Sequence, residues 1–254
     1  MTVVDDHYDR LLAEHYTWML GGDLERVADN QVELLRSLGM AAGPGDTATA
    51  VDLGCGPGPQ ALALARLGYT SVTAIDTSAA LLDELAETAE RLGCESIVQP
   101  IRRDLRGALP DLATAGSLAA VVCMGDTLPH LPTRADVVEL IADVAEALRP
   151  GGSFVVTYRD QTLALPVSDR FIPVRSTADQ ILTCYLDYVD EDTVLVHDLL
   201  HVRRGDNWYL TAGSYPKLRL SYRWLSEQCQ AVGLDVHHED NGPCGMKVLH
   251  AVKP

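Results

Sequence analysis

Residues 49–67, which read TAVDLGCGPGPQALALARL, decide the fold of this chain. A short apolar segment ends at Asp52, glycines alternate with other residues at positions 54, 56 and 58, and apolar residues then recur at helical spacing. A strand, a glycine turn and a helix in this order place backbone N–H groups at a helix N-terminus, where the helix dipole is positive. Gly54 and Gly56 allow a ligand to approach the main chain closely, because they have no Cβ. The sequence therefore predicts a ligand over this turn.

The glycine spacing and the acid before it favour one kind of ligand. The dinucleotide-binding fingerprint is G-x-G-x-x-G, whereas this chain has G-x-G-x-G, with Pro59 where the third glycine of the fingerprint belongs. Asp52 would repel a phosphate group, but it suits a ligand that carries an ammonium group. The alternative is an ordinary glycine turn of an α/β protein.

The segment VDLGCGPG resembles the first motif of the class I S-adenosylmethionine-dependent methyltransferases. In that family the turn and the acid hold the methionine part and the ribose of the cofactor. The resemblance implies S-adenosylmethionine as cofactor, bound here by Asp52, Gly54, Cys55 and Gly56. The turn LRPGG at residues 148–152, which leads into a predicted strand, is a further mark of the same family.

A second acid follows the next predicted strand. Asp76 ends the segment 71–76, where a carboxylate can accept hydrogen bonds from both hydroxyls of a ribose. The alternative is that this carboxylate caps the following helix. Because Ser78 already fits the cap position, we expect Asp76 and the adjacent Thr77 to bind the cofactor.

Asp104 and Leu105 follow the third predicted strand, residues 96–101. The resemblance implies that Asp104 accepts a hydrogen bond from the adenine amino group, and that Leu105 packs on the adenine or donates from its backbone. Taken by itself, Asp104 could equally pair with Arg102 or Arg106 at the surface.

The loop after the fourth predicted strand is expected to face the transferred methyl group. In open α/β sheets, ligands lie at the carboxyl ends of the strands where the strand order reverses, and the first and fourth strands flank that point. Met124 and Gly125 would then border the cofactor, while Asp126 and His130 would be available to the substrate. The loop resembles that of the small-molecule methyltransferases related to glycine N-methyltransferase. The alternative for His130 is a structural role, in which its ring bonds the loop backbone.

The fifth predicted strand, residues 153–158, ends in further candidates at the same edge. If the acceptor must lose a proton, His130, Tyr158 or Asp160 could be the general base, and histidine has the most suitable ordinary pKa. An amine that is already neutral needs no base. Arg159, together with Tyr16 of the N-terminal segment, is a candidate substrate contact.

An aromatic, amphipathic segment precedes the glycine motif. Residues 5–20 are predicted to form one helix with Tyr8 and Tyr16 on one face, and residues 24–38 form a second helix that Asp23 caps. These helices either pack on the core or form a lid over the cofactor, as such segments do in many relatives of the family.

An insertion separates the fifth strand from the last helix. Residues 180–213 alternate apolar and polar positions, which predicts an antiparallel three-stranded meander that must pack on something. We expect a cap over the substrate pocket. The alternative is an edge extension or a dimer contact, which would make the protein a homodimer. His197 and His201 share a strand face, but no third ligand follows nearby, so no metal site is expected.

These elements together predict an α/β fold: a Rossmann-like, mostly parallel seven-stranded sheet whose last strand is antiparallel. The expected units are an N-terminal helical lid (1–40), a cofactor-binding core (41–160 and 221–254) and an inserted β cap (161–220).

The composition narrows the class of partner. The formal net charge of −16 opposes binding to nucleic acid and to anionic membranes, and so favours a small-molecule substrate. The chain shows no signal-peptide pattern, no apolar run long enough to span a bilayer and no disulfide spacing among its six cysteines. A cytoplasmic, reduced protein is expected.

The predicted function is methyl transfer from S-adenosylmethionine to an N, O or C nucleophile of a small molecule, which leaves S-adenosylhomocysteine. One alternative is a nucleotide-dependent oxidoreductase, which Pro59 and the antiparallel last strand disfavour. The other is a non-catalytic partner protein that retains the fold. The intact set of motif residues argues against it, namely Asp52, Gly54, Gly56, Asp76 and Asp104.

Overall fold

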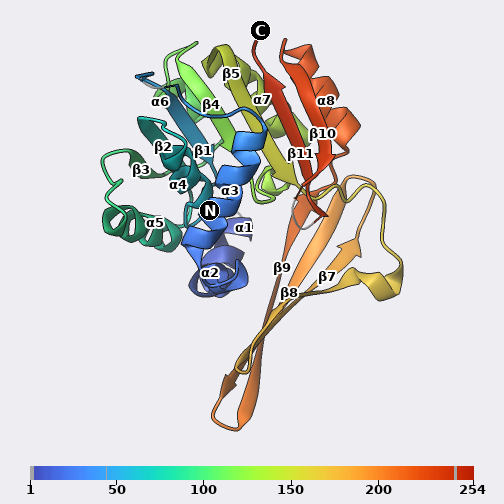
Figure 1. The fold of residues 1–254 in the computed structure, drawn as a ribbon. Coiled ribbons are helices and arrows are strands. Elements are labelled where there is room, and N and C mark those ends of the chain that lie inside the picture. Colours follow the sequence, from blue (N-terminus) through green and yellow to red (C-terminus); the bar gives the residue numbers. More distant parts are fainter. Residues whose placement is uncertain (1–2, 44, 243–244) are drawn as a thin grey trace.

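The computed structural model describes residues 3–43, 45–242 and 245–254, which form a seven-stranded and a four-stranded sheet (Figure 1). The larger sheet consists, in spatial order, of β10 (Asp235–Asn241), β11 (Lys247–Val252), β5 (Leu148–Tyr158), β4 (Leu118–Cys123), β1 (Thr49–Leu53), β2 (Ser71–Asp76) and β3 (Val98–Arg102). The pairs β1–β2, β1–β4, β2–β3 and β4–β5 are parallel, whereas β11 is antiparallel to both β5 and β10. The predicted fold class is therefore confirmed. Strand order reverses at β1, between β2 and β4.

Helices cover both faces of this sheet, because alternate strand residues point to opposite sides. Val51 and Leu53 pack on one face with α6 (Leu109–Leu112), α7 (Arg134–Ala147) and α8 (Tyr222–Ala231). Ala50 packs on the other face with α3 (Leu24–Ser37), α4 (Pro59–Arg66) and α5 (Ala79–Arg91). Asp23 caps α3 as predicted, by accepting a hydrogen bond from the Arg26 N–H.

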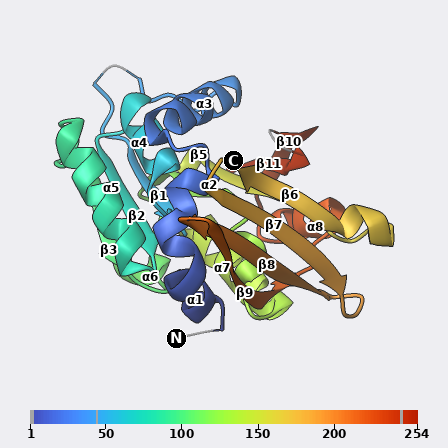
Figure 2. The ribbon, with the colours of Figure 1, turned by 90° about the horizontal axis from the view of Figure 1, so that it is seen from below.

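The N-terminal segment does not form the single helix predicted over 5–20. It consists of α1 (Val3–His7), the π-helical turn η1 (Tyr8–Leu12), the 3₁₀ turn η2 (Ala13–His15) and α2 (Tyr16–Met19). Leu11 and Leu12 pack against Leu182 and Leu200 of the smaller sheet. The segment is thus divided into four short turns where it packs against the smaller sheet. The helical spacing of the sequence does not reveal this packing. Figure 2 shows α1 and α2 between the large sheet and the smaller one.

The smaller sheet, residues 171–218, is here called the wing. It is antiparallel, with strands β6 (Phe171–Ser176), β7 (Gln180–Tyr188), β8 (Thr193–Arg204) and β9 (Asn207–Leu218), preceded by the 3₁₀ turn η4 (Val167–Arg170). The predicted meander corresponds to β7–β9, and β6 is an additional edge strand. Pro173 lies in β6, where a missing N–H is tolerated at a sheet edge. In Figure 1 the wing projects away from the core beside β11.

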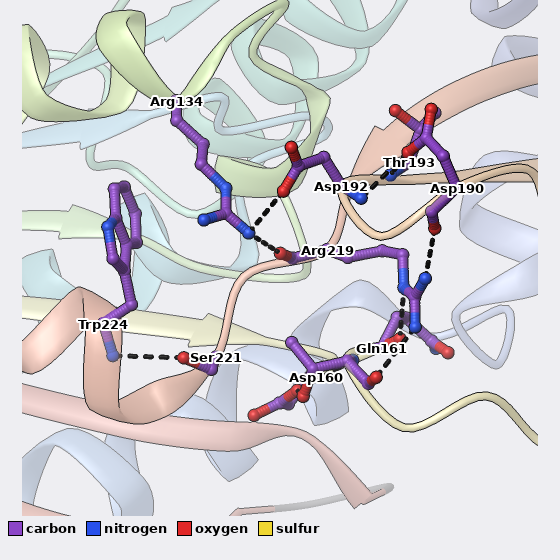
Figure 3. A network of polar contacts seen from close by, with 10 residues as sticks. Arg134, Asp160, Gln161, Asp190, Asp192, Thr193, Arg219, Ser221 and Trp224 are labelled. Atoms are coloured by element: carbon purple, nitrogen blue, oxygen red, sulfur yellow. Dashed lines mark hydrogen bonds and ion pairs between the residues drawn. The ribbon is translucent and has the colours of Figure 1, made fainter.

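Arg219 fixes the root of the wing to the core (Figure 3). Its guanidinium donates to the carbonyl oxygens of Gln161 (2.9 Å), Thr162 (2.7 Å) and Asp190, and the residue is 9% exposed. Arg134 on α7 adds a second brace, because it donates to the Arg219 carbonyl (3.0 Å) and forms an ion pair with Asp192. The chain therefore leaves and re-enters the core at one rigid junction.

In the described part of the chain, no helix is both long enough and apolar enough to cross a membrane.

Candidate functional site

A cleft of about 850 Å³ lies at the carboxyl ends of β1, β2 and β4, which is where the strand order reverses. Its walls come from the glycine turn after β1, the ends of β2 and β3, the loop after β4, and the N-terminal turns. The residues that line it are Val4, Tyr8, Tyr16, Gly54, Gly56, Ile75, Asp76, Thr77, Ser78, Leu81, Arg103, Asp104, Leu105, Arg106, Gly125, Thr127, His130, Leu131 and Pro132.

The glycine turn is built so that backbone forms the wall of the cleft. Gly54 and Gly56 have φ of 70° and 54°, a region that favours glycine. A Cβ at Gly54 would lie 2.2 Å from Cγ2 of Thr127, in the loop after β4. A Cβ at Gly56 would instead point toward Tyr16, 3.5 Å from its ring, across space that the cleft occupies. The turn thus packs against the loop after β4 and leaves Gly56 open to a ligand.

Asp76 joins the glycine turn to the next helix. Its Oδ2 accepts a hydrogen bond from the Gly56 N–H at 2.8 Å, and its Oδ1 accepts one from the Ser78 N–H at 2.9 Å. Ser78 occupies the N-cap position of α5, as expected, but its side chain makes no capping hydrogen bond there. The aspartate accepts the helix-entry N–H and lines the cleft as well.

Asp104, Leu105 and Thr77 line the cleft at the ends of β2 and β3. The Asp104 carboxylate also accepts hydrogen bonds from the guanidinium and the backbone N–H of Arg106, which lower its pKa below the ordinary value. Both roles considered from the sequence are therefore compatible with its position: it borders the cleft and pairs with Arg106.

Asp52 is 1% exposed and does not line the cleft. Burial raises the pKa of its carboxyl to about 8, partly offset by a hydrogen bond from the Ala61 N–H. Its Oδ2 atom has no hydrogen-bond partner among the described residues. Cys55 and Met124 are also buried behind the wall of the cleft. Asp52, Cys55 and Met124, which the sequence predicted as cofactor contacts, therefore lie behind the wall of the cleft and support the glycine turn.

His130 is the candidate general base that the structure places in the cleft. Its Nε2 lies 3.3 Å from Tyr8 Oη, and its ring stacks on Tyr215 with centroids 5.2 Å apart. Its Nδ1 is buried without a hydrogen-bond partner, and no bond from the ring to loop backbone occurs, among the described residues. Burial, with the charges of Lys217 and His7, holds the pKa of His130 well below its ordinary value, so the imidazole is neutral.

The other two candidate bases lie elsewhere. Tyr158 is fully buried in the core at the end of β5. Asp160 accepts hydrogen bonds from the Thr162 and Tyr222 N–H groups at the wing junction. Neither lines the cleft.

Two substrate candidates form a polar cluster just outside the cleft. The Asp126 Oδ1 accepts a hydrogen bond from the Arg159 N–H at 2.8 Å, and the Asp126 Oδ2 lies 2.6 Å from the Lys217 Nζ. Tyr16, the third substrate candidate, lines the cleft.

Sequence reasoning assigned no site role to Tyr8, Tyr215 or Lys217. Tyr215 and Lys217 are two residues apart on β9, so they share a face. Positions 213, 215, 217 and 219 alternate along the chain, and this alternation is the sequence signal from which Tyr215 and Lys217 could have been predicted. Within the described residues, no cluster of three or more metal-ligating side chains occurs.

The open sheet with an antiparallel last strand, the glycine turn and the acid at the end of β2 are the features expected from the resemblance to class I S-adenosylmethionine-dependent methyltransferases. The comparison with known families agrees. Residues 50–152 match the family described as "Methyltransferase domain", so this part of the chain is a domain of that family.

Similar sequences are ubiquinone biosynthesis O-methyltransferases. The one from Xanthomonas oryzae pv. oryzae is 39% identical over 119 residues, which cover 46% of this chain and 45% of that protein. The one from Xylella fastidiosa is 38% identical over 119 residues, 46% of this chain and 44% of that protein. The chain thus spans less than half the length of the curated relatives it matches.

Similar solved structures cover nearly the whole chain. An S-adenosylmethionine-dependent methyltransferase from Clostridium acetobutylicum has a TM-score of 0.71 at 14% identity and covers 98% of this chain and 96% of its own. An amino pentose methyltransferase from Micromonospora echinaspora, solved with S-adenosylmethionine bound, has a TM-score of 0.70 at 17% identity, with 95% and 96% covered. At these identities the likeness shows the fold, wing included.

Proposed function

We propose that the protein transfers the methyl group of S-adenosylmethionine to an N, O or C nucleophile of a small molecule and leaves S-adenosylhomocysteine. The observation that carries the proposal is the composition of one cleft. At one end it has the open glycine turn and the acids of β2 and β3, and at the other end a neutral histidine among tyrosines. The first end suits an adenosine and the second suits an acceptor.

The residues present fit the cofactor. Gly56 leaves the space that a Cβ would fill, and Asp76, Thr77, Asp104 and Leu105 line the same wall. When bound, S-adenosylmethionine supplies a methyl group already activated by the sulfonium. The protein has then to align the acceptor with it and to exclude water.

His130 is the residue best placed to take a proton from the acceptor. Because its imidazole is neutral and lies in the cleft, a ring nitrogen can accept a proton from a hydroxyl or an ammonium group. Tyr16 lines the same cleft, and Asp126 and Arg159 stand behind it as further acceptor contacts. The loop's likeness to the glycine N-methyltransferase group supports a small acceptor.

The units predicted from the sequence give this site its enclosure. The N-terminal segment (1–40) acts as a lid, since Tyr8 and Tyr16 line the cleft, and the insertion (161–220) acts as a cap, since Tyr215 stacks on His130. The net charge of −16 supports a protein that does not bind nucleic acid. The cysteines, which lack disulfide spacing, support a reduced, cytoplasmic protein.

We further propose a homodimer formed through the outer face of the wing. Phe171, Ile181, Trp208 and Leu210 on this face are 37–57% exposed. Their cross-strand rows contain no acid, although the chain has 36, so two copies can meet here without repulsion between carboxylates. Sedimentation should show a dimer that Trp208→Glu with Leu210→Glu dissociates; a monomeric wild type would contradict the proposal.

Calorimetric titration with S-adenosylmethionine and S-adenosylhomocysteine tests the proposed function. Micromolar binding by the wild type, lost in Gly56→Arg, is expected because the new side chain fills the cleft at a residue with positive φ. Labelled-methyl transfer to panels of small amines, phenols and carboxylates then tests catalysis. Absence of binding by either compound would contradict the proposal, and binding without transfer to any acceptor would favour a non-catalytic partner protein.

A further inference from the structure

One face of β9 contacts, in sequence order, the N-terminal segment and the loop after β4. A Cβ at Gly213 would lie 2.6 Å from the His7 ring, so the lid packs directly on the strand there. Two residues on, Tyr215 stacks on His130, and two further, Lys217 pairs with Asp126. Residues two apart on a strand share a face, so β9 connects lid and loop to the wing.

The Asp126 end of this ion pair is held in a strained position. Asp126 has a φ of 73° and is the one non-glycine residue with a positive φ in the described part of the chain. Such a conformation costs free energy and persists only where surrounding contacts fix it. Here those contacts are the hydrogen bond from the Arg159 N–H, the hydrogen bond from the Asp126 N–H to the Thr157 carbonyl, and the ion pair with Lys217. The Arg159 guanidinium lies further away, with its Nη1 3.7 Å from the Asp126 Oδ2.

The ion pair is also largely removed from solvent. The Lys217 and Asp126 side chains are 11% and 9% exposed, and the Lys217 Nζ lies 2.6 Å from the Asp126 Oδ2. Burying two charges costs desolvation free energy that their attraction offsets only in part, so an apolar pair of similar volume would stabilise the fold as well. A pair that adds little stability and holds a strained residue beside the cleft points to a positional role.

We propose that Lys217 is a positioning residue for the acceptor end: its ion pair with Asp126 clamps the loop 125–131 to β9, so that His130 faces the cleft. This rests on the proposed function, because it assigns His130 to the acceptor. Arg219, the residue directly after β9, supports the clamp by anchoring the end of the strand to the core.

The charge of Lys217 has a second effect on the same histidine. It lies close enough to disfavour the imidazolium form, and it lowers the pKa of His130 together with burial and His7. The titratable groups around the ring are His7 and Tyr8 from the N-terminal segment and Tyr215 and Lys217 from β9. Behind them lie Asp198 from β8, which pairs with His7, and Asp126, which pairs with Lys217. Removing the lysine charge should therefore make His130 easier to protonate.

The test compares Lys217→Met, which removes the charge at similar length, with Lys217→Arg, which keeps it. Arg203→Met, on the exposed hairpin of the same sheet, is the matched control for losing one positive charge. The full-length protein, with labelled histidine rings, is titrated by NMR, and S-adenosylhomocysteine binding is measured by calorimetry. Asp126→Asn with Lys217→Met removes both charges while keeping a residue that tolerates positive φ.

In Lys217→Met, His130 should titrate at a higher pH than in the wild type, and its ring signals should broaden or shift as the loop loosens. In Lys217→Arg, which keeps the charge, His130 should titrate as in the wild type. Arg203→Met should also leave the His130 titration unchanged. S-adenosylhomocysteine affinity should stay within about twofold, and KM for an identified acceptor should rise about tenfold with a smaller change in kcat.

Unchanged His130 titration and ring signals in Lys217→Met would overturn the proposal, as would an equal effect of Arg203→Met. If Lys217→Met does not fold, the His130 titration and ring signals are measured in the double variant, Asp126→Asn with Lys217→Met, and the same criteria apply. These readings need no methyl transfer, so they remain decisive even if the wild type binds no cofactor and the proposed function fails.

Discussion

The two ends of the cleft are built in different ways. The cofactor end is made by short local segments at the tips of neighbouring parallel strands, and its key contacts, such as Asp76 to the Gly56 N–H, involve backbone. The acceptor end is made by side chains from three distant segments: Tyr8 and His130, which are 122 residues apart, meet Tyr215 of the wing.

Because of this difference, the two ends of the cleft tolerate different substitutions. Backbone walls leave little room for substitution, because a Cβ at Gly54 collides with the neighbouring loop. Side-chain walls can change residue by residue while the fold is kept, provided that the wing keeps its register. Changes at the cofactor end should therefore affect cofactor binding and stability together, whereas changes at the acceptor end should leave cofactor binding intact.

The largest expected effect is the pH dependence that Asp52 gives to stability. Its folded-state pKa is about 8, above the ordinary value of 3.8, so its contribution to stability is fully present below pH 4 and is lost as the pH rises through 8. Relative to Asp52→Asn, which cannot ionise, the wild type should lose about 6 kcal/mol of unfolding free energy over that range.

Urea unfolding of both proteins at several pH values measures this difference. Parallel pH curves for the two proteins would contradict the prediction. Repeating the series with S-adenosylmethionine sharpens it: if Asp52 serves the ammonium group of the ligand, wild-type affinity should rise with pH, and Asp52→Asn should lack that rise.

Gly54→Ala should be the next most damaging change. Its Cβ would lie 2.2 Å from Thr127 Cγ2, at a residue with φ of 70°, which should cost about 3 kcal/mol of stability and most of the cofactor affinity. Thr127→Ser removes the colliding methyl group, so the double variant should recover part of the loss. Thermal unfolding and calorimetry measure both, and a double variant no better than Gly54→Ala would show that backbone strain alone is responsible.

The same contrast explains what could be predicted from the sequence. The strand, glycine turn and acids of the cofactor end follow from local patterns, as does the cap at Asp23. Ser78 stands at the predicted N-cap position, but local patterns do not reveal that its hydroxyl makes no capping bond, nor that its own N–H donates to Asp76.

The acceptor end lacks such local patterns. Tyr8 lies in a segment whose helix breaks while it packs against the wing, and Tyr215 reaches His130 only through the path of the inserted sheet. Spacing along the chain carries no information on such contacts, because they arise when distant segments pack together.

His130→Gln probes the chemistry of the acceptor end. For an acceptor that must be deprotonated, kcat/KM should fall about 100-fold, with cofactor affinity unchanged. Because the pKa of His130 lies well below the ordinary value, wild-type activity should stay level as the pH falls through 6.5, and should decline only where the imidazole becomes protonated. Labelled-methyl transfer across pH measures both. Equal rates in the two proteins would mean that the acceptor reaches the site already deprotonated.

The smallest expected effect tests whether the wing influences acceptor binding alone and leaves cofactor binding unchanged. Arg219→Lys keeps the charge but loses the forked donor that binds three carbonyl groups, which should cost about 2 kcal/mol of stability. Arg223→Lys, at an exposed ion pair on α8, is the control and should cost little. If the two ends are independent, Arg219→Lys should raise KM for the acceptor and leave S-adenosylhomocysteine affinity within about twofold. A matching loss of cofactor affinity would show that the wing root also sets the geometry of the glycine turn, and the division between the two ends would then not hold.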